Sequence, residues 1–175
     1  MTVTAVDKDA AALTMTVTAE FRATPERVWQ LWADPRQLER WWGPPSYPAT
    51  VDSHDLRPGG RVEYHMTGPS GDLPRGYWDV DEVQPPHRLT FHDGFANDDG
   101  TPNDDLPGPA SAVVTIEDAG AGLTRMRIES TFPSAEAMEQ VLAMGTEEGQ
   151  SQAVSQIDAI LAEETIQRRS SGKPW

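Results

Sequence analysis

Residues 134–161, SAEAMEQVLAMGTEEGQSQAVSQIDAIL, carry apolar or small side chains at steps of three and four along their whole length. These positions are Met138, Val141, Leu142, Gly145, Gly149, Ala153, Val154, Ile157, Ile160 and Leu161. The spacing places them on one face and predicts a single continuous helix of about seven turns. Ser134 is placed to cap the first turn, and Glu136 to interact with the positive end of the helix dipole.

Two glycines, Gly145 and Gly149, lie within the apolar face of this predicted helix. Each weakens a helix by about 1 kcal/mol relative to alanine, so a compensating role is expected. Two roles are open at this point. Either a sheet packs closely against the helix there, or space is kept for a bound molecule.

The chain before this helix has the pattern of an antiparallel sheet with two short helices. Residues 13–21 alternate apolar and polar side chains, which predicts a half-buried strand. Thr24-Pro25 and Asp34-Pro35 each combine an N-cap residue with a proline at the first helical position, and they predict two short helices. Further strands are expected between glycine- and proline-rich turns, at residues 49–55, 61–67, 76–83, 88–92, 112–117 and 123–131.

The order of these elements predicts an α+β fold. In it, a curved antiparallel sheet of about six to seven strands packs around a long C-terminal helix. The length of 175 residues is typical of one domain. Residues 1–11 are expected to be a flexible lead-in, residues 12–164 the folded domain, and residues 165–175 a polar C-terminal tail. Residues 95–109 are expected to be a polar loop.

Composition excludes several classes of function. The formal net charge of −14 argues against nucleic acid and anionic membranes as partners. The absence of cysteine excludes disulfides and thiolate zinc sites. No signal-peptide pattern and no apolar run of membrane-spanning length is present. A cytoplasmic location is therefore expected.

Five segments that follow one another along the chain form a recognisable pattern. They are FRATPERVWQLWADPRQLERWWG at 21–43, DLRPGGR at 55–61, MTGPSG at 66–71, PPHRLTF at 85–91 and GTEEG at 145–149. Residues 13–163 resemble the START-like helix-grip superfamily, also called SRPBCC or Bet v-like. More narrowly, they resemble domains similar to the C-terminal part of the activator of the heat-shock protein 90 ATPase. The resemblance implies a curved sheet that grips a long C-terminal helix.

The same superfamily includes lipid and hormone binders, polyketide aromatases and cyclases, and a self-resistance protein that binds its antibiotic. Its fold therefore leaves the function open. Thr146 and Gln150 stand where tryptophans often follow the helix glycines in the family pattern. This departure is expected to reshape the mouth of a cavity.

Strand and helix phase predict a pocket lining between the sheet and the long helix. Its members are Trp41, Val62, Tyr64, Met66, Trp78, Phe91, Met126, Ile128, Met138, Leu142, Gly145 and Gly149. Aromatic and methionine side chains suit an adaptable, mostly apolar site with a few polar anchors. The alternative for each large apolar residue is an ordinary place in the core. Tyr64 is the best polar candidate inside, as a hydrogen-bond anchor or a general acid.

Other polar residues predict neither a metal site nor a catalytic group. The four histidines lack metal-ligand spacing. Residues 97–100, NDDG, resemble part of a calcium loop, but Phe95 and Leu106 would then stand where oxygen ligands are needed. Neither a nucleophile elbow nor a phosphate-binding glycine loop is present. We therefore predict no catalytic residue, no metal and no cofactor.

Three functions are consistent with these patterns. The first is binding of a small apolar or aromatic molecule between the sheet and the helix. The second is an enzyme similar to a polyketide cyclase or aromatase, which requires at least two convergent polar side chains in the pocket, one with a perturbed pKa. The third is a co-chaperone-like interaction domain, which requires an extended exposed apolar patch. Pairing through an exposed sheet edge would also allow a homodimer.

Overall fold

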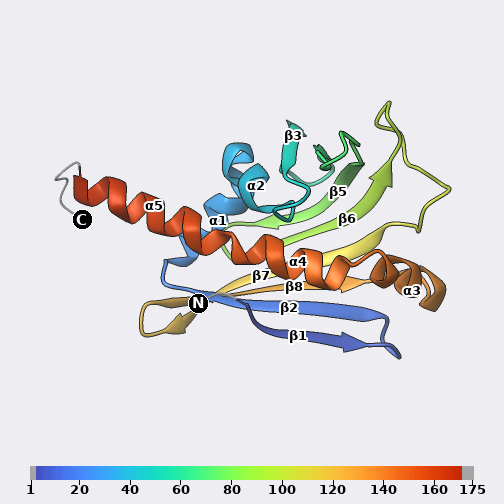
Figure 1. The fold of residues 1–175 in the computed structure, drawn as a ribbon. Coiled ribbons are helices and arrows are strands. Elements are labelled where there is room, and N and C mark those ends of the chain that lie inside the picture. The colour runs from blue at the N-terminus through green and yellow to red at the C-terminus, as the bar shows by residue number, and fades with distance from the viewer. Residues whose placement is uncertain (1–2, 171–175) are drawn as a thin grey trace.

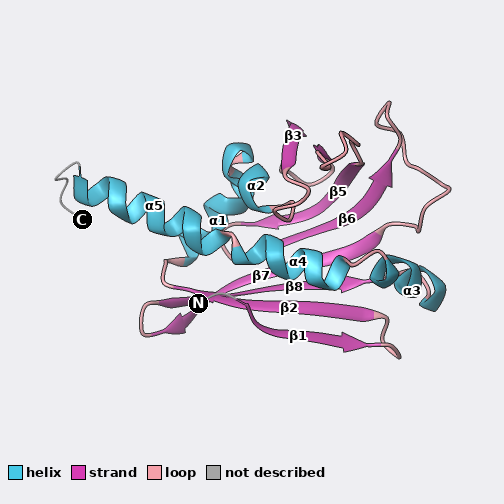
Figure 2. Cartoon of the chain, viewed as in Figure 1, coloured by secondary structure: helices cyan, strands magenta, loops and turns pink. Residues whose placement is uncertain are grey.

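The computed structural model describes the backbone of residues 3–170 and the side chains of residues 3–163, and a large sheet dominates it (Figures 1 and 2). The strands are β1 (Val3–Asp9), β2 (Thr14–Phe21), β3 (Ala49–His54), β4 (Arg61–Met66), β5 (Arg75–Gln84), β6 (Arg88–Ala96), β7 (Ala110–Gly120) and β8 (Leu123–Thr131). The helices are α1 (Pro25–Ala33), α2 (Pro35–Trp41), α3 (Ala135–Ala143), α4 (Thr146–Ser155) and α5 (Ile157–Ser170).

The strands form one antiparallel sheet in the order β1-β2-β8-β7-β6-β5-β4-β3. This confirms the predicted α+β helix-grip architecture, with eight strands instead of about six to seven. The added strand is β1, so the prediction of a flexible lead-in is wrong for residues 3–9. These residues pair with β2, and Val3 and Val6 pack against the core, which gives the segment apolar contacts that hold it in the sheet.

Capping residues begin α1 and α2 where the sequence predicts them. The Thr24 side chain accepts a hydrogen bond from the Arg27 N–H at 3.2 Å, and the Asp34 side chain accepts one from the Arg36 N–H at 2.9 Å. Each bond satisfies a first-turn N–H that has no partner within the helix. Both predicted short helices are therefore confirmed.

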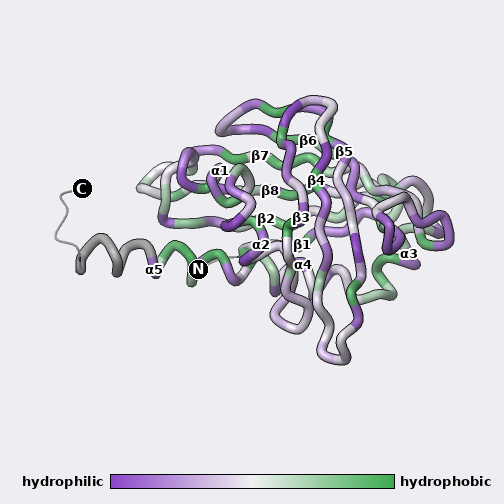
Figure 3. The backbone as a smooth tube through the Cα atoms, turned by 90° about the horizontal axis from the view of Figure 1, so that it is seen from above, coloured by the Kyte–Doolittle hydropathy of each residue, from purple (hydrophilic) through white to green (hydrophobic). Residues whose placement is uncertain are grey.

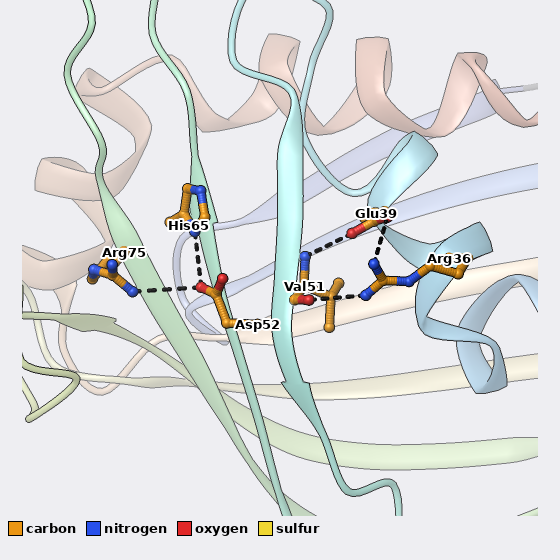
Figure 4. Close-up of polar contacts among 6 residues, drawn as sticks. All are labelled: Arg36, Glu39, Val51, Asp52, His65 and Arg75. Atoms are coloured by element: carbon orange, nitrogen blue, oxygen red, sulfur yellow. Dashed lines mark hydrogen bonds and ion pairs between the residues drawn. The ribbon is translucent and has the colours of Figure 1, made fainter.

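Helix α2 covers part of the edge strand β3 (Figure 4). The Arg36 guanidinium donates to the Val51 carbonyl oxygen at 3.0 Å, and the Val51 N–H donates to the Glu39 carboxylate at 3.0 Å. Arg36 and Glu39 also form an ion pair at 3.3 Å. Two backbone groups that an edge strand would leave open to pairing with another chain are thereby occupied.

The next residue of β3 points to the opposite face of the sheet, as alternation along a strand requires. The Asp52 carboxylate lies 2.8 Å from His65 Nδ1 and 3.4 Å from Arg75 Nη1, on the two neighbouring strands (Figure 4). This row of polar side chains keeps the outer face of β3, β4 and β5 hydrophilic.

The C-terminal segment forms three helices, so the single continuous helix predicted for residues 134–161 is wrong. Ser134 does cap the first of them, accepting the Ala137 N–H at 3.0 Å. Gly145 then has φ +85°, a left-handed conformation that ends α3 and precedes α4. Only Gln156, which keeps a right-handed helical conformation, separates α4 from α5. The long C-terminal helix therefore begins at Thr146.

Apolar and polar contacts hold α4 and the start of α5 across the sheet. Their buried side chains in the main core are Val154, Ile157 and Ile160. The Gln156 amide donates to the Gly43 carbonyl oxygen at 2.7 Å, and Lys8 of β1 forms an ion pair with Glu147 at 2.7 Å. The α5 ribbon continues away from the sheet in Figure 1, and hydrophobic residues mark the first part of this helix in Figure 3. None of the helices in residues 3–170 combines the length and apolar character needed to cross a bilayer.

The apolar core has a large cluster and a small one. In the large cluster, Trp32 contacts Trp41 edge-on at a ring distance of 4.7 Å, and Trp78 stacks on Phe91 at 4.1 Å. The small cluster consists of Met15, Phe132, Met138 and Val141, with α3 supplying the last two. The candidate site borders both clusters.

Candidate functional site

A pocket of about 540 Å³ lies between the inner face of the sheet and α4. Apolar side chains make up most of its wall: Met15, Trp41, Trp42, Pro44, Met66, Pro74, Phe95, Ala110, Phe132, Val141, Met144 and Ala153. Polar side chains and glycines complete it: Tyr47, Tyr64, Asp72, Asp93, Gly108, Ser130, Thr146, Gly145, Gly149 and Gln150. Strands far apart in the sequence therefore meet α4 at one concave site.

The two glycines of the C-terminal segment contribute to this pocket in different ways. Gly145 permits the left-handed turn that separates α3 from α4, and α4 begins beside the pocket as a result. Gly149 lies inside α4, where a Cβ would meet nothing nearer than Pro44 Cγ at 4.0 Å. Because no neighbour packs closely there, Gly149 leaves space on the pocket side of the helix.

A tyrosine–aspartate pair lies on the sheet side of the pocket. The Tyr64 hydroxyl of β4 donates a hydrogen bond to the Asp93 carboxylate of β6 at 2.9 Å. The phenol reaches across the intervening strand β5 because the residue paired with Tyr64 there is Gly76. A Cβ at Gly76 would lie 2.3 Å from the Tyr64 hydroxyl oxygen. This glycine therefore makes the pair sterically possible.

Burial shifts the acid–base properties of both members of the pair. Desolvation raises the pKa of the Asp93 carboxyl to about 7, and the hydrogen bond from Tyr64 offsets only part of this effect. Desolvation also raises the pKa of Tyr64 well above its ordinary value, and the adjacent Asp93 charge raises it further. Near neutral pH, Asp93 can therefore gain or lose a proton while Tyr64 remains protonated. A carboxyl with these properties can act as a general acid or base.

Two further polar groups of the pocket wall are buried without a hydrogen-bond partner, namely the Trp42 indole Nε1–H and the Gln150 side-chain oxygen. The Trp42 ring contacts Tyr64 edge-on at 6.0 Å and Trp78 edge-on at 4.8 Å. The Trp42 indole lowers the pKa of the Tyr64 hydroxyl, against the larger effects of desolvation and of the Asp93 charge, which raise it. Both atoms are buried, so they lie behind the surface of the pocket although their residues belong to its wall.

Five of the twelve residues predicted to line a pocket do so: Trp41, Tyr64, Met66, Gly145 and Gly149. Five others, Val62, Trp78, Phe91, Met126 and Ile128, are buried in the large core cluster. There, tryptophans from the α1–α2 region fill the space over the sheet. For example, the Trp32 indole lies 3.3 Å from the Met126 sulfur. Met138 belongs to the small cluster, and Leu142 packs against it. A ligand-binding role for the first five stays a prediction.

Sequence reasoning missed several residues of the pocket, above all Asp93 and Trp42, whereas Gln150, expected at the mouth of a cavity, does line the pocket. Asp93 continues the inward phase of Leu89 and Phe91, but β6 was expected to end at His92. The strand runs on to Ala96, and Phe95, expected in a polar loop, lines the pocket. The alternation from 89 to 95 is the signal that would have identified both residues.

The histidines have separate partners within the described part of the chain. His54 Nε2 lies 3.0 Å from the Trp32 carbonyl oxygen, and His87 Nδ1 lies 2.8 Å from that of Ile116. His92 pairs with Asp81 at 3.1 Å. Across residues 3–163, no three histidine or acidic side chains form a group suited to a metal ion.

A second hollow, of about 350 Å³, lies over strands β1, β2, β7 and β8. Its lining is Asp7, Thr16, Thr18, Val113, Thr115, Arg127 and Glu129. Charged and threonine side chains dominate this wall, and aromatic residues are absent from it. We therefore place the candidate site in the larger pocket.

Solved structures of other proteins share this fold. Protein Ms6760 from Mycobacterium smegmatis is 55% identical in sequence, with a TM-score of 0.83, and the match covers 91% of this chain and 96% of that protein. A protein from Arthrobacter aurescens is 49% identical, with a TM-score of 0.88 and 93% of each chain covered. CalU16 from Micromonospora echinospora is 17% identical, with a TM-score of 0.55, covering 88% of this chain and 79% of that protein, and it supports the fold alone.

Comparison with curated proteins found no match. The model of one protein family, Activator of Hsp90 ATPase homolog 1-like protein, matches residues 22–162. This range includes α1, α2, strands β3 to β8, and α4 with Gly145 before it and Gly149 inside it, so it contains most of the pocket wall. The chain belongs to the Activator of Hsp90 ATPase homolog 1-like protein family.

Proposed function

We propose that the protein binds a small, mostly apolar or aromatic molecule in the pocket between the sheet and α4. The observation that carries this proposal is a pocket of about 540 Å³ lined largely by aromatic, methionine and proline side chains. Small-molecule sites have volumes of about 300–1,000 Å³ and combine such walls with a few polar groups. Membership of a helix-grip family is consistent with a ligand-binding role.

The composition of α4 supports the same proposal. A glycine inside a helix lowers helix stability by about 1 kcal/mol relative to alanine. A Cβ at Gly149 would meet only Pro44 Cγ, at 4.0 Å, so packing does not require a glycine at this position. The open surroundings of Gly149 therefore support a role in leaving space for a ligand.

Titration with N-phenyl-1-naphthylamine, an uncharged probe that fluoresces in apolar surroundings, tests the proposal. We expect saturable binding to the wild type and loss of binding in Gly149→Phe, whose ring would occupy the pocket. Gln152→Phe is the matched control, because it places the same ring on an exposed position of the same helix. Gly149→Leu replaces Gly149→Phe as the pocket-filling variant if circular dichroism shows that the phenylalanine variant is unfolded. Equal binding to the wild type and the pocket variant, or no binding at all, would contradict the proposal.

A second candidate function, acid–base catalysis of the cyclase or aromatase kind, is favoured by the Tyr64–Asp93 pair. Two convergent polar groups, one with a perturbed pKa, are what such a reaction requires. Ring opening of 5-nitrobenzisoxazole is a test reaction for such a base. The base removes the C3 proton, the N–O bond breaks and a coloured phenolate forms. We expect turnover that rises with pH around 7 and is lost in Asp93→Asn. Turnover that Asp93→Asn retains would exclude this carboxylate as the base.

A further inference from the structure

We propose that the ligand of this pocket is an apolar or aromatic amine whose protonated nitrogen pairs with the Asp93 carboxylate. The inference rests on the proposed binding function and names the chemical class of the ligand. Three features of the pocket support it: an oxygen of Asp93 that a ligand can reach, the charges of the pocket wall, and the apolar and aromatic surroundings of the carboxylate.

The Asp93 carboxylate has one oxygen engaged and one open to the pocket. Asp93 shares the inner face of β6 with Phe95, two residues along the strand, and both line the pocket. One oxygen, Oδ1, accepts the hydrogen bond from the Tyr64 hydroxyl at 2.9 Å. The other, Oδ2, has no hydrogen bond or ion pair within the described side chains, and it is not among their buried unpaired atoms. Because Asp93 is only partly buried, Oδ2 remains accessible to a ligand.

The charged side chains of the pocket wall are acidic. They are Asp72 and Asp93, and within the part of the chain that the structure describes the wall contains no lysine, arginine or histidine. A cation in the pocket is therefore attracted by carboxylates and meets no positive neighbour, whereas an anion is repelled. The formal net charge of −14 favours the approach of cations in the same way.

The surroundings of Asp93 leave its negative charge poorly stabilised. Its paired residue on β7 is Ala110, and its neighbour along β6 is Phe95. Desolvation by this wall raises the pKa of Asp93 to about 7, although Tyr64 donates to it. A cation beside the carboxylate would stabilise the charged form, and the attraction is stronger where water is excluded. The aromatic rings of the wall add to it, because their faces attract cations.

The alternative is that Asp93 stays protonated and donates a hydrogen bond to an uncharged ligand. An ammonium pairs with the ionised carboxyl and an ether oxygen with the protonated one, so the affinities for the two ligands change in opposite directions with pH. Transfer of an ammonium from water into an apolar site is unfavourable and offsets much of the attraction. We therefore expect a preference of about tenfold, the lower limit for a hydrogen bond to a charged group.

Three probes of matched shape measure this preference. Dibenzylammonium has a protonated nitrogen between two benzyl groups, dibenzyl ether has an uncharged oxygen there, and 1,3-diphenylpropane has a methylene group. Displacement of N-phenyl-1-naphthylamine at about pH 7.5, where most of the Asp93 carboxyl is ionised, gives their affinities. We expect dibenzylammonium to bind about tenfold more tightly than either uncharged probe.

The pH dependence of binding tests the charge of Asp93 in the wild type. The other titratable side chains of the wall are Tyr47, Tyr64 and Asp72. The pKa of Asp72 is lowered by the hydrogen bond from Ser70, and the pKa values of both tyrosines are raised, so these groups keep one charge state near pH 7. From about pH 8 to about pH 6, the affinity for dibenzylammonium should fall by up to tenfold as Asp93 gains its proton. The affinity for diphenylpropane should stay constant.

Asp93→Asn retains the shape of the side chain and removes its charge. We expect it to abolish the preference for dibenzylammonium over dibenzyl ether and to leave diphenylpropane binding unchanged. Asp99→Asn makes the same change of charge in the exposed loop between β6 and β7, and it should retain the preference. Thermal denaturation establishes that each variant is folded. If Asp93→Asn is unfolded, the pH titration of the wild type decides.

The outcomes separate this inference from the proposed function. If N-phenyl-1-naphthylamine binds but dibenzylammonium has no preference over the uncharged probes, the amine class is wrong and the binding function stands. If a folded Asp93→Asn variant retains the preference, or the wild-type preference is the same at both pH values, the assignment to Asp93 is wrong. If no probe binds and N-phenyl-1-naphthylamine also fails, the proposed binding function itself fails.

Discussion

The space between the sheet and the helices has a filled end and an open end, although both are lined by the same kinds of side chain. At the filled end, Trp32 packs against Trp78, and both rings contact Phe91. At the open end, Trp42, Tyr64 and Phe95 face a pocket of about 540 Å³. Aromatic content therefore does not distinguish a core from a pocket here.

What differs is the element that covers each end. The filled end is covered by α1, α2 and the first turn of α5, whose large side chains, such as Trp32, Leu38 and Ile157, are fully buried. The open end is covered by α4, which contributes Thr146, Gly149, Gln150 and Ala153 to the pocket wall. Gly149 and Ala153 fill little of the space above the sheet, and the Tyr64–Asp93 pair lies on the sheet side of that space.

The largest effect is expected at the filled end. Trp78→Ala removes a fully buried ring that stacks on Phe91, and such truncations lower the free energy of unfolding by about 3–5 kcal/mol. At the open end, Met144→Ala truncates a pocket residue that is 54% exposed and should change it by less than about 0.5 kcal/mol. Urea denaturation measures both. Similar losses for the two variants would mean that the pocket is packed as tightly as the core.

The next largest effect is a pH dependence of the free energy of unfolding, which Asp93 at the open end is expected to cause. Because the pKa of Asp93 is raised to about 7 from 3.8, the native state binds more protons than the unfolded state between these values. Its contribution to stability is fully present below pH 3.8 and is lost as the pH rises towards 7. Relative to Asp93→Asn, the wild type should lose up to about 4 kcal/mol over this interval.

The control for this pH effect is Asp99, in the exposed loop between β6 and β7. Hydrogen bonds from Thr101 lower the Asp99 pKa, so its contribution has the opposite sign and is lost as the pH falls. Denaturation midpoints of Asp93→Asn and Asp99→Asn, measured at a series of pH values, provide the comparison. Parallel curves for the wild type and Asp93→Asn would rule out a buried titrating carboxyl.

A smaller loss of stability is expected at Gly76 of β5, over which the Tyr64 side chain passes to reach Asp93. Gly76→Ala places a Cβ 2.3 Å from the Tyr64 hydroxyl oxygen, so the phenol must move and the hydrogen bond to Asp93 is lost. Overpacking of this kind lowers stability by about 1–3 kcal/mol. Gly108→Ala, another glycine of the pocket wall, meets only Pro133 Cγ at 3.7 Å and should be nearly neutral. Thermal denaturation that gives equal shifts for both variants would contradict the close approach.

The smallest effects distinguish the two glycines of the C-terminal segment. Gly145→Ala should lower stability by about 1 kcal/mol, because φ +85° is unfavourable for a residue with a Cβ. Gly149→Ala should raise stability by up to about 1 kcal/mol, since it improves helix propensity and meets no close neighbour. Calorimetry of the two variants gives the sign of each effect. Effects of the same sign would mean that the glycines have one common role.

Local signals in the sequence determined most of the secondary structure. The caps at Thr24, Asp34 and Ser134 begin helices because their side chains satisfy backbone N–H groups only a few residues away. Alternation in residues 14–21 and 123–131 predicted half-buried strands for the same reason: side-chain period depends on the local backbone alone. These elements, in their order, predicted the α+β class, and the resemblance of the motifs identified the helix-grip fold.

Tertiary structure decided what the elements enclose. The apolar period of residues 134–161 is the same whether the helix is continuous or broken, and the left-handed turn at Gly145 became visible only in the fold. Tyr64, Gly76 and Asp93 lie on three different strands, so no local pattern relates them. The raised pKa of Asp93 and the volume of the pocket depend on which side chains from distant segments meet. Burial of this kind is a property of the packed chain, and a single segment does not contain it.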